Sequence, residues 1–217
     1  MQTKAFFALS AAVSLLAGAA HADALDTRID SLARDWAHVN YEVTDKTAQA
    51  SGAAKVAGEA DALAHQNPGR AEPLVWEAIA KATEAGAKGG LGGLALAKES
   101  KALLEKAEKI NPAALGDGSV YTSLGSLYAQ VPGFPLGFGD AGKARSYLQR
   151  ALAVNPNGVD PNFFYGDFLF RQNDYAGASK ALQKAIAAPG RPGHEVADKG
   201  RKAQAQALLT QAQAKAH

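Results

Sequence analysis

The chain has 217 residues, of which 47% are hydrophobic, 20% are charged and none is cysteine, and its formal net charge is +2. The absence of cysteine excludes disulfide scaffolds and thiolate zinc sites. The net charge is also far smaller than the strongly basic charge typical of a nucleic-acid-binding protein. Abundant alanine with only 7% aromatic residues favours closely packed helices, so the composition predicts one soluble all-α domain or a short repeat array.

The first 22 residues have the pattern of a secretory signal peptide. Lys4 supplies the positive start, residues 5–20 form an uncharged apolar run, and Ala-His-Ala at 20–22 fits the small-x-small rule of signal peptidase. A membrane anchor is the weaker interpretation, because about 20 apolar residues are needed to span a bilayer and Asp23 follows at once. We expect cleavage before Asp23, no membrane insertion afterwards and, without a lipobox cysteine, a periplasmic or secreted protein.

The mature chain is expected to form one helical-repeat domain, residues 23–217. An Asn-Pro pair recurs every 44 residues, at Asn67, Asn111 and Asn155, and periods in this range are typical of stacked repeats. Each pair follows a segment with apolar residues at helical spacing, and proline ends a helix because its ring clashes with the preceding turn. The predicted hairpins span about residues 24–68, 72–112, 118–156 and 159–190.

The first predicted helix of the mature chain has one apolar face. Its apolar residues are separated by four, three, four and three positions. They are Leu25, Ile29, Leu32, Trp36 and Val39. We expect this helix to pack against the helix that ends at Asn67.

The segment 159–190 resembles a complete tetratricopeptide repeat. The matching positions are Tyr165, Gly166, Leu169, Ala178, Leu182 and Ala185. Small residues at Gly166 and Ala178 allow two helices to approach closely, and Asp174 is the predicted N-cap of the second helix. The preceding unit matches at Gly125 and Ala144, with seven extra residues between its helices.

A polar helix over about 194–215 is expected to cap the array. We expect it to pack through Val196, Ala203, Ala207 and Leu208. The resemblance implies a right-handed α-solenoid of about nine helices, ending in this capping helix. An exported helical-repeat chain with lengthened hairpins is also similar to the periplasmic helical component that accompanies some TRAP-type transporters. Members of that family are typically lipoproteins, and the missing cysteine departs from their pattern.

Two segments lengthen the predicted hairpins, residues 85–93 and 131–140, and equivalent loops of successive repeats lie side by side. The Gly-rich first segment offers backbone N–H groups to an anion. The candidate ligand residues there are Lys88, Gly89 and Gly90. The second segment carries three apolar side chains that need a packing partner. They are Phe134, Leu136 and Phe138, which either plug the groove or form a hydrophobic lip for a partner.

The first helices of tetratricopeptide hairpins usually line a concave groove. In the last unit the candidate partner-binding residues are Phe163, Asp167, Phe170 and Arg171. Carboxylate-clamp members use basic residues and Asn at corresponding places, so Phe163 and Asp167 depart from that pattern. Because Phe163, Phe164 and Phe168 cannot all point one way on a helix, at least one is expected in the core.

No motif supports catalysis, a metal or a cofactor. The segment from Gly137 to Lys143 matches the start of a P-loop, but Ala144 replaces the Ser or Thr that holds magnesium. His194-Glu195 begins like a zinc-protease motif, but Asp198 stands where the second His is required. Glutamates interleaved with lysines indicate solvated, ion-paired helix faces. They include Glu77, Glu84, Glu99, Glu105 and Glu108.

Together these patterns predict an exported, non-catalytic scaffold that binds a protein or extended peptide in its concave groove. The alternative is a small-molecule-binding accessory component of a periplasmic TRAP-type solute transport system, in which the two lengthened segments close an apolar pocket.

Overall fold

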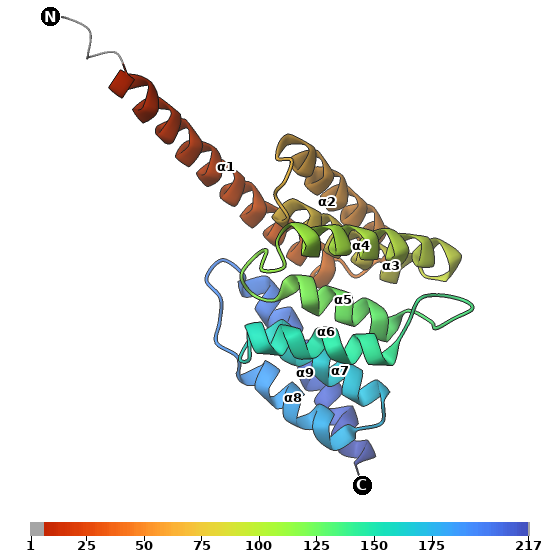
Figure 1. Ribbon diagram of the computed structural model, residues 1–217. Helices are drawn as coiled ribbons and strands as arrows, with labels where there is room; N and C mark the ends of the chain where they lie inside the picture. The colour runs from red at the N-terminus through yellow and green to blue at the C-terminus, as the bar shows by residue number, and fades with distance from the viewer. Residues whose placement is uncertain (1–6, 217) are drawn as a thin grey trace, which may run out of the picture.

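The computed structural model describes residues 7–216, with side chains from Ala24 onward, and these residues form nine helices and no strand (Figure 1). The predicted all-α class and the predicted number of helices are confirmed for this part of the chain. The helices are α1 (Phe7–Tyr41), α2 (Lys46–Gln66), α3 (Glu72–Lys88), α4 (Gly90–Ile110), α5 (Ser119–Gln130), α6 (Ala141–Val154), α7 (Val159–Arg171), α8 (Tyr175–Ala187) and α9 (Glu195–Lys215).

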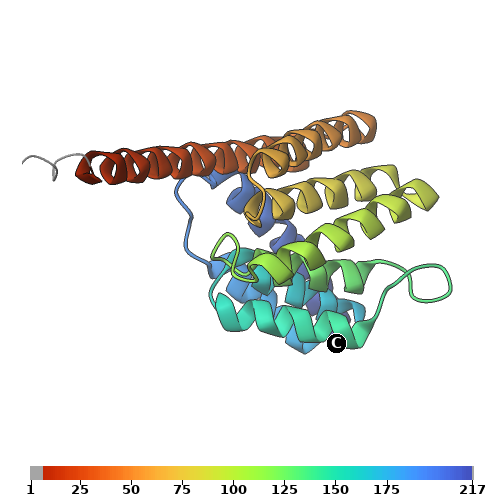
Figure 2. The ribbon, with the colours of Figure 1, turned by 45° about the horizontal axis from the view of Figure 1, so that its top comes forward.

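Successive helices pack in pairs, α3 with α4, α5 with α6 and α7 with α8, while α2 contacts both α1 and α3. The odd-numbered helices also contact one another in order from α1 to α9, so they form one continuous layer. In addition, α1 contacts α9, which brings elements from opposite ends of the chain together (Figures 1 and 2).

The helix ends follow the capping residues in the sequence. Asn67, Asn111 and Asn155 are the C-cap residues of α2, α4 and α6, so each Asn-Pro pair ends a helix as predicted. The predicted N-cap at Asp174 is also confirmed, because its carboxylate accepts a hydrogen bond of 2.8 Å from the backbone N–H of Gly177.

Small residues set the spacing within the hairpins. A Cβ atom on Gly166 would lie 2.8 Å from Leu182 Cγ, and one on Gly125 would lie 2.6 Å from Leu148 Cγ. Both distances are shorter than van der Waals contact, so these pairs of helices pack at glycine. Ala178 is fully buried on the facing helix.

The core consists of two clusters of buried apolar residues. One extends from α3 to α9, and the other joins α1, α2 and α3. Ile79 and Leu115 pack against both clusters and connect them. Four residues of the predicted apolar face of α1 are buried, and the fifth, Trp36, packs against the smaller cluster.

The prediction of a Gly-rich loop at residues 85–93 is wrong. Helix α3 continues to Lys88 and α4 begins at Gly90, so Gly89 alone separates them. Gly89 has a φ of 64°, which favours glycine, and a Cβ on Gly93 would lie 2.6 Å from the Ala85 carbonyl oxygen. The glycines therefore make a sharp turn between two closely packed helices.

The expected packing face of α9 is confirmed at Leu208, which packs against the larger core cluster, and is wrong at the other three positions. Val196, Ala203 and Ala207 are exposed. The buried residues of α9 are Ala197, Asp198, Arg201, Ala205, Leu209 and Ala212. The buried face includes two charged side chains, which a pattern of apolar residues does not detect.

The predicted signal-peptide cleavage position lies within α1, while Lys4 lies outside the described residues. The first half of α1 extends away from the other helices in both views (Figures 1 and 2). Within the part of the chain that the structure describes, no helix combines the length and apolar character needed to cross a bilayer.

Candidate functional site

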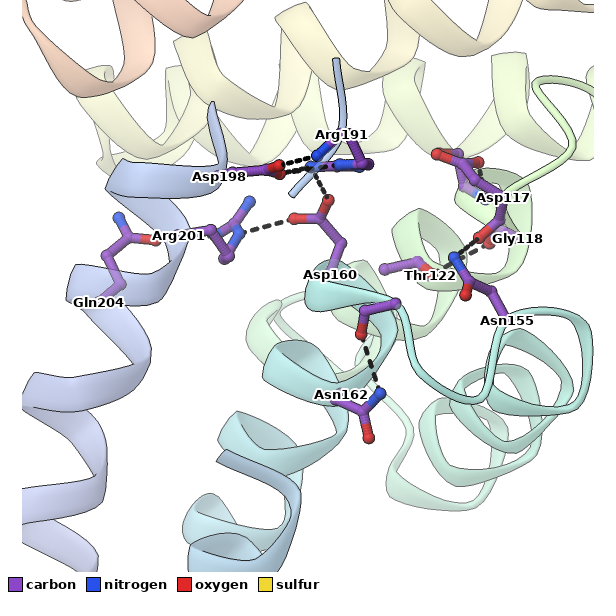
Figure 3. A network of polar contacts seen from close by, with 12 residues as sticks. Asp117, Gly118, Thr122, Asn155, Asp160, Asn162, Arg191, Asp198, Arg201 and Gln204 are labelled. Carbon is purple, nitrogen blue, oxygen red and sulfur yellow. Dashed lines mark hydrogen bonds and ion pairs between the residues drawn. The ribbon is translucent and has the colours of Figure 1, made fainter. Parts of the chain in front are cut away.

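A cluster of charged residues fastens α9 to the start of α7 (Figure 3). Asp160, in the first turn of α7, accepts a hydrogen bond of 2.8 Å from Arg201 Nε and lies 3.1 Å from Arg191 Nη2. Asp198 of α9 accepts a hydrogen bond of 2.7 Å from the backbone N–H of Arg191, and its Oδ1 lies 2.6 Å from Arg191 Nη2. We call Asp160, Arg191, Asp198 and Arg201 the charged cluster.

The charged cluster favours the ionised form of Asp160. Burial alone raises the pKa of Asp160, but the Arg201 and Arg191 guanidiniums outweigh it and hold that pKa below its usual range. By contrast, burial raises the pKa of Asp117, despite a hydrogen bond from Ser119. The cluster thus stabilises the charge of Asp160, whereas Asp117 lacks a comparable ion pair among the described contacts.

Arg201 also connects α9 to aromatic rings on two other helices. Its guanidinium carbon lies 4.6 Å and 4.5 Å from the ring centres of Phe163 and Phe164, and 5.7 Å from that of Tyr41 at the end of α1. Burial raises the pKa of Tyr41 to about 12. These contacts explain how α1, α7 and α9 meet.

The candidate binding residue Phe163 therefore lies against the protein's own capping helix. Phe163 is partly buried and packs against the larger core cluster, and Arg201 covers its ring. Phe168 is the residue of the three that enters the core, at 1% exposure, which confirms that at least one Phe is buried. Partner contact at Phe163 stays a prediction.

The other three candidate residues of α7 lie together at its opposite end. Asp167, Phe170 and Arg171 line a depression of about 350 Å³ that is open to solvent. Its remaining lining residues are Asn173, Tyr175, Leu208 and Lys215. Arg171 Nε donates a hydrogen bond of 2.8 Å to Asp167 Oδ2, and the rings of Phe170 and Tyr175 meet edge to face at 5.4 Å. This end of α7 therefore offers aromatic and charged groups on one surface.

The segment 131–140 is an ordered loop with its own hydrogen bonds. The backbone N–H of Gly139 donates to the Pro132 carbonyl at 2.9 Å, and that of Gly137 donates to the Gly133 carbonyl at 3.1 Å. The Phe134–Pro135 peptide bond is cis. The loop extends beyond the ends of α5 and α6 in both views (Figures 1 and 2).

The three apolar side chains of this loop differ in environment. Phe134 is 93% exposed and Leu136 is 72% exposed. Phe138 instead packs edge to face on Tyr128 at 5.6 Å, beneath Lys101 Nζ at 5.6 Å from its ring centre. The loop therefore does not plug the groove with Phe134 and Leu136, and those two side chains form a projecting apolar tip.

The start of α4 lies beside this loop, as the stacking of equivalent segments predicted. A Cβ on Gly137 would lie 3.3 Å from Leu94 Cδ1. Leu91, in the first turn of α4, is 87% exposed. The apolar surface at this edge thus includes residues of two successive hairpins.

The candidate anion site at the same edge has less free charge than expected. Lys88 Nζ lies 2.6 Å from Glu84 Oε1 and pairs with it, and the backbone N–H of Gly89 donates to the Ala85 carbonyl. Gly90 is the first residue of α4. Binding of a ligand at Lys88, Gly89 and Gly90 stays a prediction.

Two further sequence patterns have structural explanations. Asp140 is the N-cap of α6 and accepts a hydrogen bond from the backbone N–H of Lys143, whose Nζ lies 5.3 Å from the Tyr128 ring centre. Glu77 and Glu84 are each only 6% exposed, so the expectation that they face solvent is wrong. Burial raises the pKa of Glu77. Among the described residues, no His, Asp and Glu side chains form a group that could hold a metal ion.

Sequence reasoning missed the charged cluster and Lys215. Arg201 lies four residues after Ala197 and four before Ala205, so it shares a helix face with small apolar residues. That spacing was the available signal for a buried Arg. The acidic partner Asp160 is 41 residues away in sequence, and no local pattern reveals such a contact.

Residues 136–192 match the family model of the tetratricopeptide repeat. This segment is a tetratricopeptide repeat. It contains the end of the loop 131–140, which we call the projecting loop, together with α6, both helices of the α7–α8 hairpin and Asp160 and Arg191 of the charged cluster. Domains built from such repeats typically act as protein-interaction scaffolds and are usually non-catalytic. No curated protein shows significant sequence similarity to the chain.

Proposed function

We propose that the protein is an exported, non-catalytic scaffold that binds a protein partner through the projecting loop and the open end of α7. The observation that carries this proposal is the exposure of Phe134 and Leu136 on a loop that is held by internal hydrogen bonds. Apolar side chains that lie far from the protein's own core lose unfavourable hydration when a partner covers them.

Because the loop is held in one conformation by hydrogen bonds, its exposed side chains are well suited to anchor a partner. Association costs less when the binding residues already have their bound conformation, because fewer backbone and side-chain states are lost. Aromatic residues are also frequent among the few side chains that dominate interface energies. Phe134 combines both properties, with Leu136 beside it as a second apolar contact.

The depression at the end of α7 supplies polar contacts that the loop lacks. Asp167 and Arg171 form an ion pair there, next to Phe170. Interfaces commonly combine apolar anchors with a polar rim. Because this depression is open to solvent, it fits a protein segment better than an enclosed small molecule.

Export is supported by the apolar run at 5–20 and by the packing of α1. Leu25 is buried against the smaller core cluster. A chain that begins at Asp23 therefore retains every α1 residue of that core, of which Leu25 is the first. N-terminal sequencing of the protein recovered from the periplasm or medium tests this step, with Asp23 as the expected first residue.

Site-specific photocrosslinking tests the partner surface. A benzoylphenylalanine at position 134 is expected to give a discrete protein adduct in the producing cell, and the same group at exposed Lys180 of α8 serves as the matched control. With the captured partner purified, Phe134→Ala is expected to weaken binding about 30-fold, the effect of an interface hot spot. Identical adducts at both positions, or none at position 134, would contradict the proposal.

A further inference from the structure

The side chain of Lys215 lies over the aromatic pair at the open end of α7. Its Nζ is 5.3 Å from the ring centre of Phe170 and 5.6 Å from that of Tyr175. Both distances are within the roughly 6 Å range in which an ammonium is attracted to the face of a ring. Lys215 is in the last turn of α9, so a charged group of the protein itself fills the aromatic part of the depression.

Several features of the depression favour a cation. Two aromatic rings border it, since Phe170 and Tyr175 meet edge to face at 5.4 Å, and an ammonium group, that of Lys215, lies over both. The depression is at the C-terminal end of α7, where the helix dipole adds partial negative charge. Asp167 contributes a carboxylate to the same lining. Because Arg171 neutralises that carboxylate and α8 begins at Tyr175 in the same lining, the two rings are the main feature that favours a cation.

We infer that this depression is a recognition site for a basic side chain of the protein partner, and that Lys215 occupies the site in the free protein. The inference rests on the proposed scaffold function and adds the chemistry of one partner group. A Lys or Arg side chain of the partner takes the place of Lys215 over Phe170 and Tyr175.

Lys215 is suited to be displaced because little else holds it. It is exposed, and the charged cluster anchors α9 near its start, at Asp198 and Arg201, rather than near Lys215. An exposed contact between a cation and a ring changes an equilibrium by only about two- to five-fold. A partner with several other contacts can therefore displace Lys215 without unfolding α9.

The structure makes a direct spectroscopic prediction for the occupied state. Lys215 Nζ lies over two rings, so ring currents are expected to move the NMR signals of the adjoining ε-methylene protons upfield of those of the other lysines. In Phe170→Leu one ring is lost, and the signals are expected to move back toward ordinary values. An unshifted Lys215 signal in the unaltered full chain would show that the site is empty and would overturn the inference.

Binding of defined probes tests the recognition step. The full-length mature protein and its Lys215→Ala variant are titrated with acetyl-lysine methylamide, acetyl-arginine methylamide and acetyl-norleucine methylamide, which has a neutral side chain. The ring signals of Phe170 and Tyr175 report binding. The two basic probes are expected to bind Lys215→Ala about three-fold more tightly than the unaltered chain, and the norleucine probe is expected to bind both proteins equally weakly.

Two controls separate this site from a general effect of charge. Lys199→Ala removes an exposed lysine from the same helix and is expected to leave probe binding unchanged, whereas Phe170→Leu is expected to abolish the preference for basic probes. Equal binding of norleucine and lysine probes, or equal affinity in the Lys215→Ala and unaltered chains, would overturn the inference. These probes do not contact Phe134. A negative probe result would therefore overturn the inference about Lys215 without affecting the crosslinking test of the proposed function.

Discussion

The two ends of α7 differ in the ion pairs that their acidic residues form. At its start, Asp160 is held between two guanidiniums, and one of these, Arg201, is itself only 8% exposed. At its end, Asp167 and Arg171 form a single ion pair at the edge of an open depression. A buried ion pair strongly resists the loss of one partner, whereas an exposed pair contributes little to stability. The contrast lies in the cations, since Arg171 is 46% exposed, so we expect the start of this helix to contribute more to stability and propose its end as the recognition surface.

The same contrast applies to aromatic residues. At the start of α7, Phe163 and Phe164 lie under Arg201, and Tyr41 joins them from α1. At the edge that carries the end of α5, Phe134 has almost no contact with the protein. Aromatic rings are therefore covered by other residues where α1 meets α9, whereas Phe134 on the projecting loop is exposed to solvent.

Removal of Arg201 is expected to have the largest effect on stability. Arg201→Ala leaves Asp160 with one guanidinium instead of two and uncovers three aromatic rings. We expect the free energy of unfolding to fall by about 3 kcal/mol, the lower end for breaking a buried pair, because Arg191 still contacts Asp160. Urea unfolding followed by circular dichroism measures the change. Lys199→Ala on the exposed face of α9 is the control, and equal loss in both variants would contradict the assignment.

Closure between α1 and α9 is tested next by Gly200→Ala. A Cβ at this position would overlap the ring of Tyr41, which also packs against Trp36 at 5.7 Å. Overpacking of this kind costs about 2 kcal/mol. Gly58→Ala in α2 is the matched control, because no atom lies within 4 Å of its Cβ position, and it is expected to stabilise the protein by about 0.5 kcal/mol.

The cost of Gly200→Ala should depend on Tyr41. In a Tyr41→Ala background the added methyl group has room, so the same substitution is expected to lose most of its effect. A double-mutant cycle in thermal unfolding measures this coupling. Additive effects would show that α1 and α9 do not meet at this point in solution.

The charged cluster also predicts how stability responds to acid. The folded pKa of Asp160 is lowered below the value of about 3.9 typical of an unfolded Asp. Its contribution is therefore present above about pH 4 and is lost as the pH falls through the folded pKa. Asp160→Asn is expected to be less stable at pH 7 and to lose less additional stability between pH 4 and pH 2. Parallel curves for Asp160→Asn and the unaltered chain, with exposed Asp30→Asn as control, would contradict this prediction.

Local patterns were sufficient to predict several helix ends and close approaches between helices. The Asn-Pro pairs mark real helix ends, and Gly125 and Gly166 mark real close approaches, because both depend on residues near in sequence or on backbone sterics. The Gly-rich segment at 85–93 was misread, since glycine serves a flexible loop and a tight turn between helices equally well. Only the contact of Gly93 with Ala85 distinguishes them.

The site was less accessible to sequence reasoning because its main contacts join distant residues. Asp160 and Arg201 are 41 residues apart, and the contact of Tyr41 with α9 crosses most of the chain. Composition and periodicity carry no information about such pairs. The exposed tip of the 131–140 loop was identified from its apolar residues, but whether it folded inward depended on hydrogen bonds that the sequence does not display.

The smallest expected effect on stability is at the projecting loop. Phe134→Ala, alone or with Leu136→Ala, is expected to change the free energy of unfolding by less than about 0.5 kcal/mol, because these side chains are exposed in the folded protein as well as in the unfolded chain. Phe138→Ala is the matched control within the loop, and loss of its contact with Tyr128 is expected to cost about 2 kcal/mol. Urea unfolding of the three variants measures both changes.

The informative quantity is the difference in free energy of unfolding between Phe134→Ala and Phe138→Ala, two changes within one loop. If Phe134→Ala destabilised the protein as much as Phe138→Ala, Phe134 would be packed in solution and the apolar tip would not exist as a binding surface. If Phe134→Ala leaves stability unchanged but removes the partner, the energy of Phe134 is expressed in the complex and not in the fold. That outcome would make the loop the functional counterpart of the charged cluster, which is expected to act on folding and not on the partner.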